Sequence, residues 1–359
     1  MRLLMLGGTE FVGRAVVEAA LDRGWDVTVF HRGRHPAPEG VTALLGDRTT
    51  APEGLAALAT GSWDAVVDTW SLAPSVVRDA ARLLAGRVER YAYVSSRSVY
   101  TWPMAAGLTE DGPLVEGSPD AGGEVPYGEA KRGGELAVAD AFGAERSLFV
   151  RAGLILGPYE NVGRLPWWLG RIARGGPVLT PGPGTLPIQY IDVRDLAEWT
   201  LDAVAAGLSG PYNLVSPSGH ATMGELLDAC VGATGRTGGT DAEADAVELR
   251  WTDPEALVAA GVEPWTELPV WLPPGETYDA MHTADVSRAL ATGLRCRPVV
   301  ETVADTWAWL ESLGGVAPDR PNRPGRPPVG LSPEREAEVL TALAGAAGHA
   351  ETAGRSGHA

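Results

Sequence analysis

Residues 2–13 read Arg-Leu-Leu-Met-Leu-Gly-Gly-Thr-Glu-Phe-Val-Gly, and this stretch decides the fold. Residues 2–6 predict a short buried strand, and the two glycines after it predict a tight turn. A helical spacing of apolar residues then begins at Phe11. A strand, a glycine turn and a helix in this order predict a pyrophosphate-binding turn, because free backbone N–H groups at a helix N-terminus attract phosphate.

One residue of this turn is unusual. Glu10 stands where a middle glycine is common. A carboxylate would repel a pyrophosphate unless it points to solvent, and we expect Glu10 to be tolerated there. The candidate cofactor contacts in and after the turn are Gly7, Gly8, Thr9, Phe11, Val12 and Gly13.

Strands and helices are predicted to alternate over the first half of the chain. The predicted strands are 2–6, 26–30, 41–45, 63–68, 91–94 and 147–150, and the predicted helices are 11–23, 75–84 and 127–142. This alternation indicates an α/β Rossmann fold, a doubly wound parallel sheet with helices on both faces. A later strand over 189–193 is predicted to return to the main sheet, with a helix over 193–205 after it.

We predict three regions along the chain. Residues 1–157 form the dinucleotide-binding Rossmann core. Residues 158–315 form a smaller, mixed substrate lobe, with returning Rossmann elements at about 186–216. Residues 316–359 comprise a Pro-rich linker, a short helix over 333–344 and a disordered tail.

The composition limits the partners. The formal net charge is −17. Nucleic-acid binders neutralise phosphates with a basic surface, and anionic membranes attract basic segments, so we expect neither partner. Cys230 and Cys296 are the only cysteines and provide neither a disulfide framework nor a zinc-ligand spacing, so no metal is expected. No signal-like or membrane-spanning run is visible, and a cytoplasmic protein is expected.

The loop after the second predicted strand is basic. It contains Arg32 and Arg34, and residues 31–37 include no acid. NAD-specific sites place an acidic residue here to bond the ribose 2′-hydroxyl, whereas arginine suits the 2′-phosphate of NADP. We therefore predict NADP(H), with NAD(H), or a merely solvated basic loop, as the alternatives. Asp47, expected to bond the adenine amino group, and Arg48 are further candidate cofactor contacts.

Tyr127 and Lys131 open the helix predicted over 127–142. Their spacing places phenol and ammonium on one helical face, where the cation stabilises the phenolate. Such a tyrosine exchanges a proton with a substrate oxygen while a nicotinamide carries hydride, and Ser96 is placed to hydrogen-bond the same oxygen. Lys131 is the only lysine in the chain, which disfavours a plain surface lysine. Lysine also reaches a cofactor ribose hydroxyl, so both residues are candidate cofactor contacts.

Together these residues resemble the extended short-chain dehydrogenase/reductase superfamily, in its NAD(P)-dependent epimerase/dehydratase-like branch. The resemblance covers about residues 1–312. Its matching segments are the turn 7–13, the serine strand 94–100, the Tyr127/Lys131 pair, and the later segments 151–158 and 190–197. It implies a catalytic serine at Ser96, a Rossmann domain with a small C-terminal substrate lobe, and a homodimer formed through the helix that carries Tyr127.

Two departures from the family narrow the chemistry. Sugar-nucleotide 4,6-dehydratases have Asp-Glu after the serine position, whereas this chain has Arg97-Ser98 and so lacks that acid and base. Nucleotide-sugar epimerases usually have an arginine for the diphosphate before the late strand, and Ile188 occupies that position. A buried diphosphate without a cation is costly, so a smaller or less charged substrate is expected. The glycine turn also resembles a subgroup with chloroplast RNA-binding members, which keeps a non-catalytic protein as an alternative.

Twelve tryptophans are many for 359 residues. Trp70, Trp102 and Trp167 fall after strands or in the lobe, and an aromatic-walled substrate pocket would explain them. Plain core packing explains most of them equally well. We include these three tryptophans and Ser98 as candidate substrate contacts.

The sequence therefore predicts an NADP(H)-dependent oxidoreductase, a ketone or aldehyde reductase or an alcohol dehydrogenase, acting on a small specialised metabolite. An NAD(P)-dependent epimerase of a sugar or related polyol is the first alternative. A regulatory or scaffold protein that binds NADP without turnover is the second.

Overall fold

The computed structural model describes residues 1–235, 246–315 and 328–355. The chain divides into two compact units. The first comprises Met1–Tyr159, Gln189–Ser218 and Asp279–Arg297, and the second comprises Glu160–Ile188, Gly219–Tyr278 and Pro298–Ala359. The chain thus crosses between the units several times, and residues 279–297 return to the first unit where the sequence predicted only lobe.

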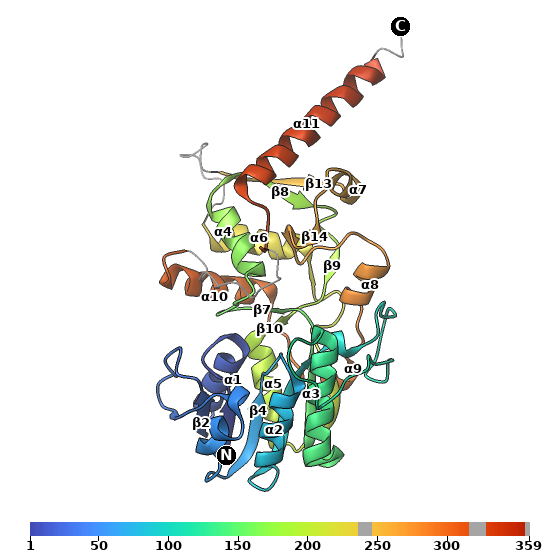
Figure 1. Ribbon diagram of the computed structural model, residues 1–359. Coiled ribbons are helices and arrows are strands. Elements are labelled where there is room, and N and C mark those ends of the chain that lie inside the picture. Colours follow the sequence, from blue (N-terminus) through green and yellow to red (C-terminus); the bar gives the residue numbers. More distant parts are fainter. Residues whose placement is uncertain (236–245, 316–327, 356–359) are drawn as a thin grey trace. The chain divides into compact units, whose positions relative to one another are not determined.

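A seven-stranded parallel sheet forms the centre of the first unit (Figure 1). Its strands, in spatial order, are β11 (Gly210–Leu214), β6 (Ser147–Ala152), β5 (Val88–Ser96), β4 (Trp63–Asp68), β1 (Arg2–Leu6), β2 (Asp26–His31) and β3 (Thr42–Leu45). Every neighbouring pair is parallel. The order reverses beside β1, which places a topological switch point there, where ligands bind in sheets of this kind. The predicted Rossmann fold is confirmed.

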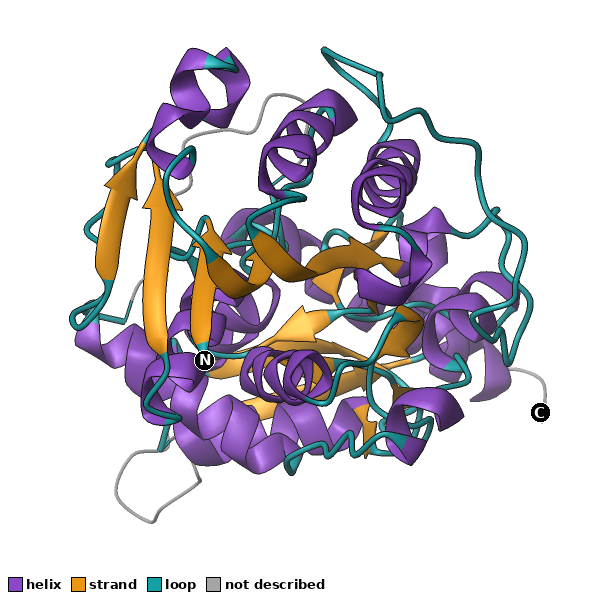
Figure 2. Ribbon diagram, turned by 90° about the horizontal axis from the view of Figure 1, so that it is seen from below, coloured by secondary structure: helices purple, strands orange, loops and turns teal. Residues whose placement is uncertain are grey.

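Helices cover both faces of this sheet (Figure 2). On one face α1 (Phe11–Asp22) packs against α5 (Val193–Ala205). On the other face α2 (Pro74–Leu84) packs against α3 (Tyr127–Phe142). Because both faces are buried, the strands read as near-continuous apolar runs rather than as alternating ones.

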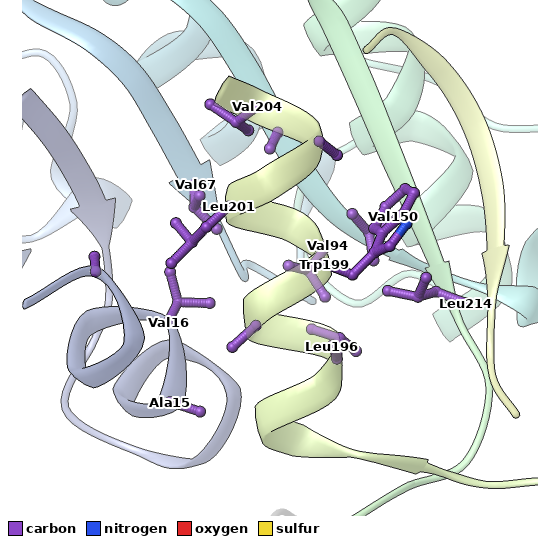
Figure 3. Packing of buried hydrophobic residues seen from close by; sticks show 14 of the residues in the cluster. Ala15, Val16, Val67, Val94, Val150, Leu196, Trp199, Leu201, Val204 and Leu214 are labelled. Carbon is purple, nitrogen blue, oxygen red and sulfur yellow. The ribbon is translucent and has the colours of Figure 1, made fainter. Parts of the chain in front are cut away.

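The two faces have separate hydrophobic cores. Leu3 and Met5 of β1 belong to the core shared with α1 and α5, whereas Leu4 and Leu6 belong to the core on the opposite face. Successive side chains of a strand point to opposite faces, so one short strand supplies both cores. Trp199 of α5 lies among the residues of the first core (Figure 3). This packing fixes where each strand ends, and so fixes the carboxyl edge of the sheet.

The prediction that residues 189–193 form a strand of the main sheet is wrong. β10 (Ile191–Asp192) pairs with β7 (Ile155–Leu156) in a separate two-stranded sheet. The strand that returns to the main sheet is β11, which pairs with β6. β11 begins with Gly210 and Pro211, which are unfavourable in strands, so the sequence did not indicate it. Proline is tolerated here because β11 is an edge strand with one unpaired side. The predicted helix over 193–205 is confirmed as α5.

Short elements complete the first unit. They are the 3₁₀ turns η1 (Arg48–Thr50), η2 (Glu53–Leu58), η3 (Arg97–Val99) and η4 (Ala144–Arg146), the helix α9 (Ser287–Ala291), and the second half of α8 (Glu276–His282). η3 follows β5 directly, and η1 follows β3 closely, so both lie at the carboxyl edge of the sheet.

The second unit contains short sheets and packed helices. Its strands are β8 (Gly176–Pro181) with β13 (Val247–Thr252), β9 (Pro187–Ile188) with β12 (Ala221–Thr222), and β14 (Pro264–Trp265) with β15 (Leu268–Pro269). Its helices are α4 (Arg164–Ala173), α6 (Met223–Ala233), α7 (Pro254–Ala259), α10 (Val299–Ser312) and α11 (Pro333–Arg355). α4, α6 and α10 pack against one another.

The C-terminal helix is longer than the sequence predicted. α11 runs to Arg355 instead of ending at 344, because the alanine-rich continuation favours a helix. Its first turn is fixed by Glu336, whose carboxylate is buried with Arg171 and accepts from the backbone N–H of Leu179 at 3.0 Å. Most of the predicted linker, 316–327, and the end of the predicted tail, 356–359, lie outside the described residues. Among the residues that the structure describes, no helix combines the length and apolar character needed to cross a membrane.

Candidate active site

The turn between β1 and α1 requires glycine, because side chains at its glycine positions would be strained or would clash. Gly7 and Gly8 have φ values of +111° and +93°, which side chains with a Cβ rarely adopt. A Cβ on Gly13 would lie 2.7 Å from the backbone N of Gly8, so the helix can approach the turn only without a side chain there. These positions are the ones at which dinucleotide-binding turns need glycine for close backbone approach.

The N-terminus of α1 is left open to an anion. Glu10 is the N-cap residue, but its side chain makes no capping hydrogen bond. Its carboxylate is 53% exposed and lies 3.9 Å from Nε2 of His35. Glu10 therefore makes no hydrogen bond to the first-turn N–H groups, and its tolerance in the turn stays a prediction. The turn and the helix N-terminus fit the pyrophosphate of a dinucleotide.

The glycine turn lies beside the carboxyl end of β4. A Cβ on Gly7 would lie 3.2 Å from Oγ1 of Thr69, the first residue after that strand. The carbonyl oxygen of the next residue, Trp70, accepts a hydrogen bond from Lys131 Nζ at 2.7 Å. The glycine turn and the candidate catalytic lysine therefore lie next to two consecutive residues, Thr69 and Trp70.

Lys131 is a buried lysine. Its side chain is 3% exposed, and its ammonium donates to the carbonyl oxygens of Trp70 and Val94, each at 2.7 Å. The ammonium also lies 4.8 Å from the centre of the Tyr93 ring. A plain surface lysine, the alternative interpretation of the sequence, does not fit this environment.

Tyr127 is the first residue of α3 and is 42% exposed. It lies one helical turn before Lys131, so the face they share runs from the surface into the interior. The start of α3 contacts η3, because a Cβ on Gly128 would lie 2.3 Å from the carbonyl oxygen of Ser98. Tyr127 is thus held next to the serine turn that follows β5.

Ser96 and Ser98 form a hydroxyl pair on that turn. Ser96 is the N-cap of η3, and its Oγ accepts from the backbone N–H of Ser98 at 3.1 Å. The two hydroxyl oxygens are 3.1 Å apart. Ser96 is nearly buried, whereas Ser98 is exposed. The structure therefore places both predicted serines in one turn at the carboxyl end of β5.

Asp47 follows β3 and is near enough to Arg32 and Arg34 for their charges to act on its carboxyl group. Hydrogen bonds from the backbone N–H and hydroxyl of Thr49 lower the pKa of the Asp47 carboxyl, and the nearby charges of Arg32 and Arg34 lower it further. Both arginines are exposed. The structure thus brings together three of the predicted cofactor contacts, with two guanidinium groups accessible to an anion.

Arg48, the next residue, differs from these three in its burial and in its contacts. It is buried, and its guanidinium makes two hydrogen bonds to Asp68, at 2.6 and 2.7 Å. Burial alone would raise the pKa of Asp68, but the charge and hydrogen bonds of Arg48 hold it below its usual value. This guanidinium is occupied by a carboxylate of the same chain, so nothing in the geometry supports a phosphate contact by Arg48. Sequence analysis did not single out Asp68, although an acid ending a buried strand was visible.

The three candidate tryptophans belong to different segments of the chain. Trp70 is partly buried, and its indole N–H donates to the carbonyl oxygen of Ala73 at 3.0 Å. Trp102 is exposed, in the loop after η3. Trp167 belongs to the second unit, where its indole N–H donates to the carbonyl oxygen of Leu331 at 3.3 Å. A pocket shared by all three remains a prediction.

A buried polar network, missed in the sequence, holds α3 in place. Glu135 is fully buried, and its carboxylate accepts from Ser95 Oγ at 2.8 Å and from Arg151 at 2.9 and 3.0 Å. Ser95 and Arg151 lie on β5 and β6, so the network ties α3 to the strand that ends in Ser96. No local motif announces this contact, because its members are far apart in the sequence.

The two departures from the family have visible structural consequences. Arg97, in the dehydratase acid position, is buried and donates to the carbonyl oxygens of Ala280 and Met281 at 2.8 and 3.0 Å. Burial lowers its pKa to about 10, so it stays charged at neutral pH. Ile188 is buried and pairs with Ala221 between β9 and β12. Neither position carries an acid or an exposed cation.

Comparisons with known proteins agree with this architecture. Residues 55–214 match the sequence model described as the NAD dependent epimerase/dehydratase family. A UDP-glucose 4-epimerase of Corynebacterium glutamicum is 27% identical over 360 residues, covering 88% of this chain and 97% of the relative. A 2-alkyl-3-oxoalkanoate reductase of Stenotrophomonas maltophilia is 27% identical over 259 residues, covering 66% of this chain and 76% of the relative.

A solved structure supports the fold. The Bordetella bronchiseptica enzyme WbmG in complex with NAD and UDP superposes with a TM-score of 0.63 at 17% identity, covering 88% of this chain and 96% of that one. At this identity the likeness concerns the fold alone.

The fold and the partial family match together indicate the class of protein. The chain is similar to NAD(P)-dependent enzymes of the extended short-chain dehydrogenase/reductase type. Residues 55–214 match the NAD dependent epimerase/dehydratase family, in agreement with the resemblance found in the sequence. A pyridine nucleotide is the class of cofactor that this match supports.

Proposed function

We propose that the protein is an NADP(H)-dependent oxidoreductase that interconverts a carbonyl group and an alcohol on a small metabolite. The observation that carries the proposal is the meeting of the glycine turn and Lys131 at residues 69–70, with Tyr127 one turn before the lysine. Hydride donor, proton donor and oxygen-binding hydroxyl would then all lie at one edge of the sheet.

When bound, the nicotinamide supplies or accepts a hydride. In the reducing direction the substrate carbon gains the hydride, and the substrate oxygen gains the phenolic proton of Tyr127, which is then replaced from solvent. Ser96, with Ser98 beside it, holds the oxygen by a hydrogen bond. Lys131 favours the phenolate that remains after the proton has left. The oxidising direction is the reverse.

The preference for NADP(H) is supported by the surroundings of Asp47. Arg32 and Arg34 are exposed and close enough to Asp47 to lower its pKa, so a 2′-phosphate there would meet two guanidinium groups. Substituting Arg32→Glu should weaken NADPH binding at least about tenfold, since a hydrogen bond to a charged group contributes about 1.5–3 kcal/mol. NADH binding, measured in the same titration, should change much less. An unaltered NADPH affinity would remove Arg32 from this role.

A reductase is favoured over a nucleotide-sugar epimerase by Ile188. This position is buried and apolar, so it offers no cation to a diphosphate. An epimerase is the second candidate, because the Corynebacterium epimerase aligns over almost its full length. Net consumption of NADPH separates the two: a reductase oxidises NADPH in proportion to product, whereas an epimerase reduces and reoxidises its bound NAD(P)+ within one turnover and consumes no NADPH.

The Tyr127→Phe variant tests the catalytic assignment. We expect kcat to fall by about 10²–10⁴-fold with a panel of carbonyl substrates and NADPH, the usual contribution of a general acid. Tyr127 is 42% exposed, so thermal stability should change little. A fully active Phe variant would remove Tyr127 from the role of proton donor. If the unsubstituted protein bound NADPH but turned over none of the panel, a protein that binds NADP(H) without turnover would be the remaining interpretation.

A further inference from the structure

The carbonyl oxygen of Trp70 receives two hydrogen bonds from different elements. Lys131 of α3 donates to it at 2.7 Å, and the Tyr93 hydroxyl of β5 donates to it at 2.9 Å. A carbonyl oxygen has two lone pairs, so it accommodates both donors. The backbone of Trp70 is also held on its N-terminal side, because the N–H of Trp70 donates to Asp68 at 2.9 Å.

Tyr93 touches Lys131 directly as well. The centre of its ring is 4.8 Å from the Lys131 ammonium, which is the range of a cation–π contact. The ring is fully buried, and burial together with the charge of Asp68 raises the pKa of its phenol well above the usual value. The hydroxyl therefore remains protonated and acts as a donor to Trp70.

Helix α3 is shaped to receive this ring. A Cβ on Gly134 would lie 2.5–2.8 Å from three atoms of the Tyr93 phenol, including its hydroxyl oxygen. Glycine weakens a helix interior, so its presence one turn after Lys131 indicates that contact with the ring outweighs this loss. Tyr93 is thus enclosed between α3 and Trp70, and it lies next to Lys131.

We propose that Tyr93 is a positioning residue, which fixes Lys131 by sharing the Trp70 carbonyl oxygen with it and by supporting its ammonium with the ring. The inference rests on the proposed function, in which Lys131 assists Tyr127. Tyr93 itself touches neither substrate nor cofactor in this proposal.

Tyr91 provides a matched control. It lies two residues earlier on β5, is equally buried, and also donates its hydroxyl, at 2.6 Å to Asp68. Asp68 keeps its bonds to Arg48 and to the N–H of Trp70 when that hydroxyl is lost. Tyr93→Phe and Tyr91→Phe therefore each remove one buried hydroxyl, but only the first removes a donor from the oxygen that Lys131 uses.

The test uses the single lysine of the chain. In full-length protein labelled with ¹⁵N-lysine, one side-chain Nζ signal reports on Lys131 without cofactor or substrate. In Tyr93→Phe we expect this signal to shift and its hydrogen exchange to accelerate by about tenfold, because the Trp70 carbonyl oxygen that accepts from the ammonium is no longer held in place by the Tyr93 hydroxyl. Tyr91→Phe should leave the signal and its exchange unchanged. Gly134→Ala, which presses on the phenol without removing it, should shift the signal in the same way as Tyr93→Phe.

Activity provides the second measurement. With NADPH and a reducible carbonyl compound, Tyr93→Phe should lower kcat about tenfold at unchanged KM, less than the ~10²-fold cost of a 1 Å misplacement. An Nζ signal unaffected by Tyr93→Phe, or affected equally by Tyr91→Phe, would overturn the positioning role. Failure of the proposed function shows separately, as absence of NADPH-dependent turnover by the unsubstituted protein, because the NMR measurement involves no turnover.

Discussion

Gly13 is the position at which a single methyl group should both destabilise the first unit and impair cofactor binding. In Gly13→Ala the new Cβ would lie 2.7 Å from the N and 3.0 Å from the Cα of Gly8. Ordinary contact begins at 3.4 Å, so the helix and the turn must separate by about 0.7 Å. Both groups are backbone, and no side-chain rotation can relieve the clash.

Two opposing effects decide the magnitude. Alanine favours a helix over glycine by about 1 kcal/mol, whereas forced overpacking of this kind costs up to about 3 kcal/mol. We therefore expect a net loss of about 2 kcal/mol in the free energy of unfolding. The displaced turn should also weaken NADPH binding by at least about tenfold, since 1.4 kcal/mol suffices for that factor.

The matched control is Gly170→Ala. Gly170 lies within α4, and a Cβ there meets nothing within 4 Å. This variant should gain about 1 kcal/mol from helix propensity and bind NADPH as the unsubstituted protein does. Chemical denaturation followed by circular dichroism measures stability, and fluorescence titration measures NADPH binding. If Gly13→Ala matched the control in both measurements, the close approach of α1 to the glycine turn could not be what this glycine is required for.

Two further predictions concern buried charges. Glu135→Gln leaves Arg151 buried without its carboxylate, so denaturant unfolding should show a loss of about 3–5 kcal/mol, whereas Glu129→Gln on the exposed side of α3 should show almost none. The pKa of Asp68 is lower in the folded than in the unfolded chain, so its stabilisation is complete above the ordinary value of 3.8 and is lost as the pH falls through the folded value. Acid unfolding monitored by circular dichroism should therefore lose part of its pH dependence in Asp68→Asn, and an identical profile would contradict the assignment.

The sequence alone determined the elements that carry the site. Periodicity predicted β1, β4, α3 and α5 closely, because each is a long or strongly patterned segment bounded by turn residues. Local spacing also identified the glycine turn and the pairing of Tyr127 with Lys131, since a turn and one helical face are properties of neighbouring residues.

Only the tertiary structure decided what these residues contact. Arg48 was a candidate cofactor contact, and the structure shows its guanidinium buried against Asp68, twenty residues away in the chain. The strand that returns to the main sheet was misplaced because strand formation depends on the neighbouring strand. β11 contains glycine and proline and is compatible only with an edge of the sheet. The sharing of the Trp70 oxygen by Lys131 and Tyr93 joins three elements. Such contacts follow from packing between distant segments, which no local pattern records.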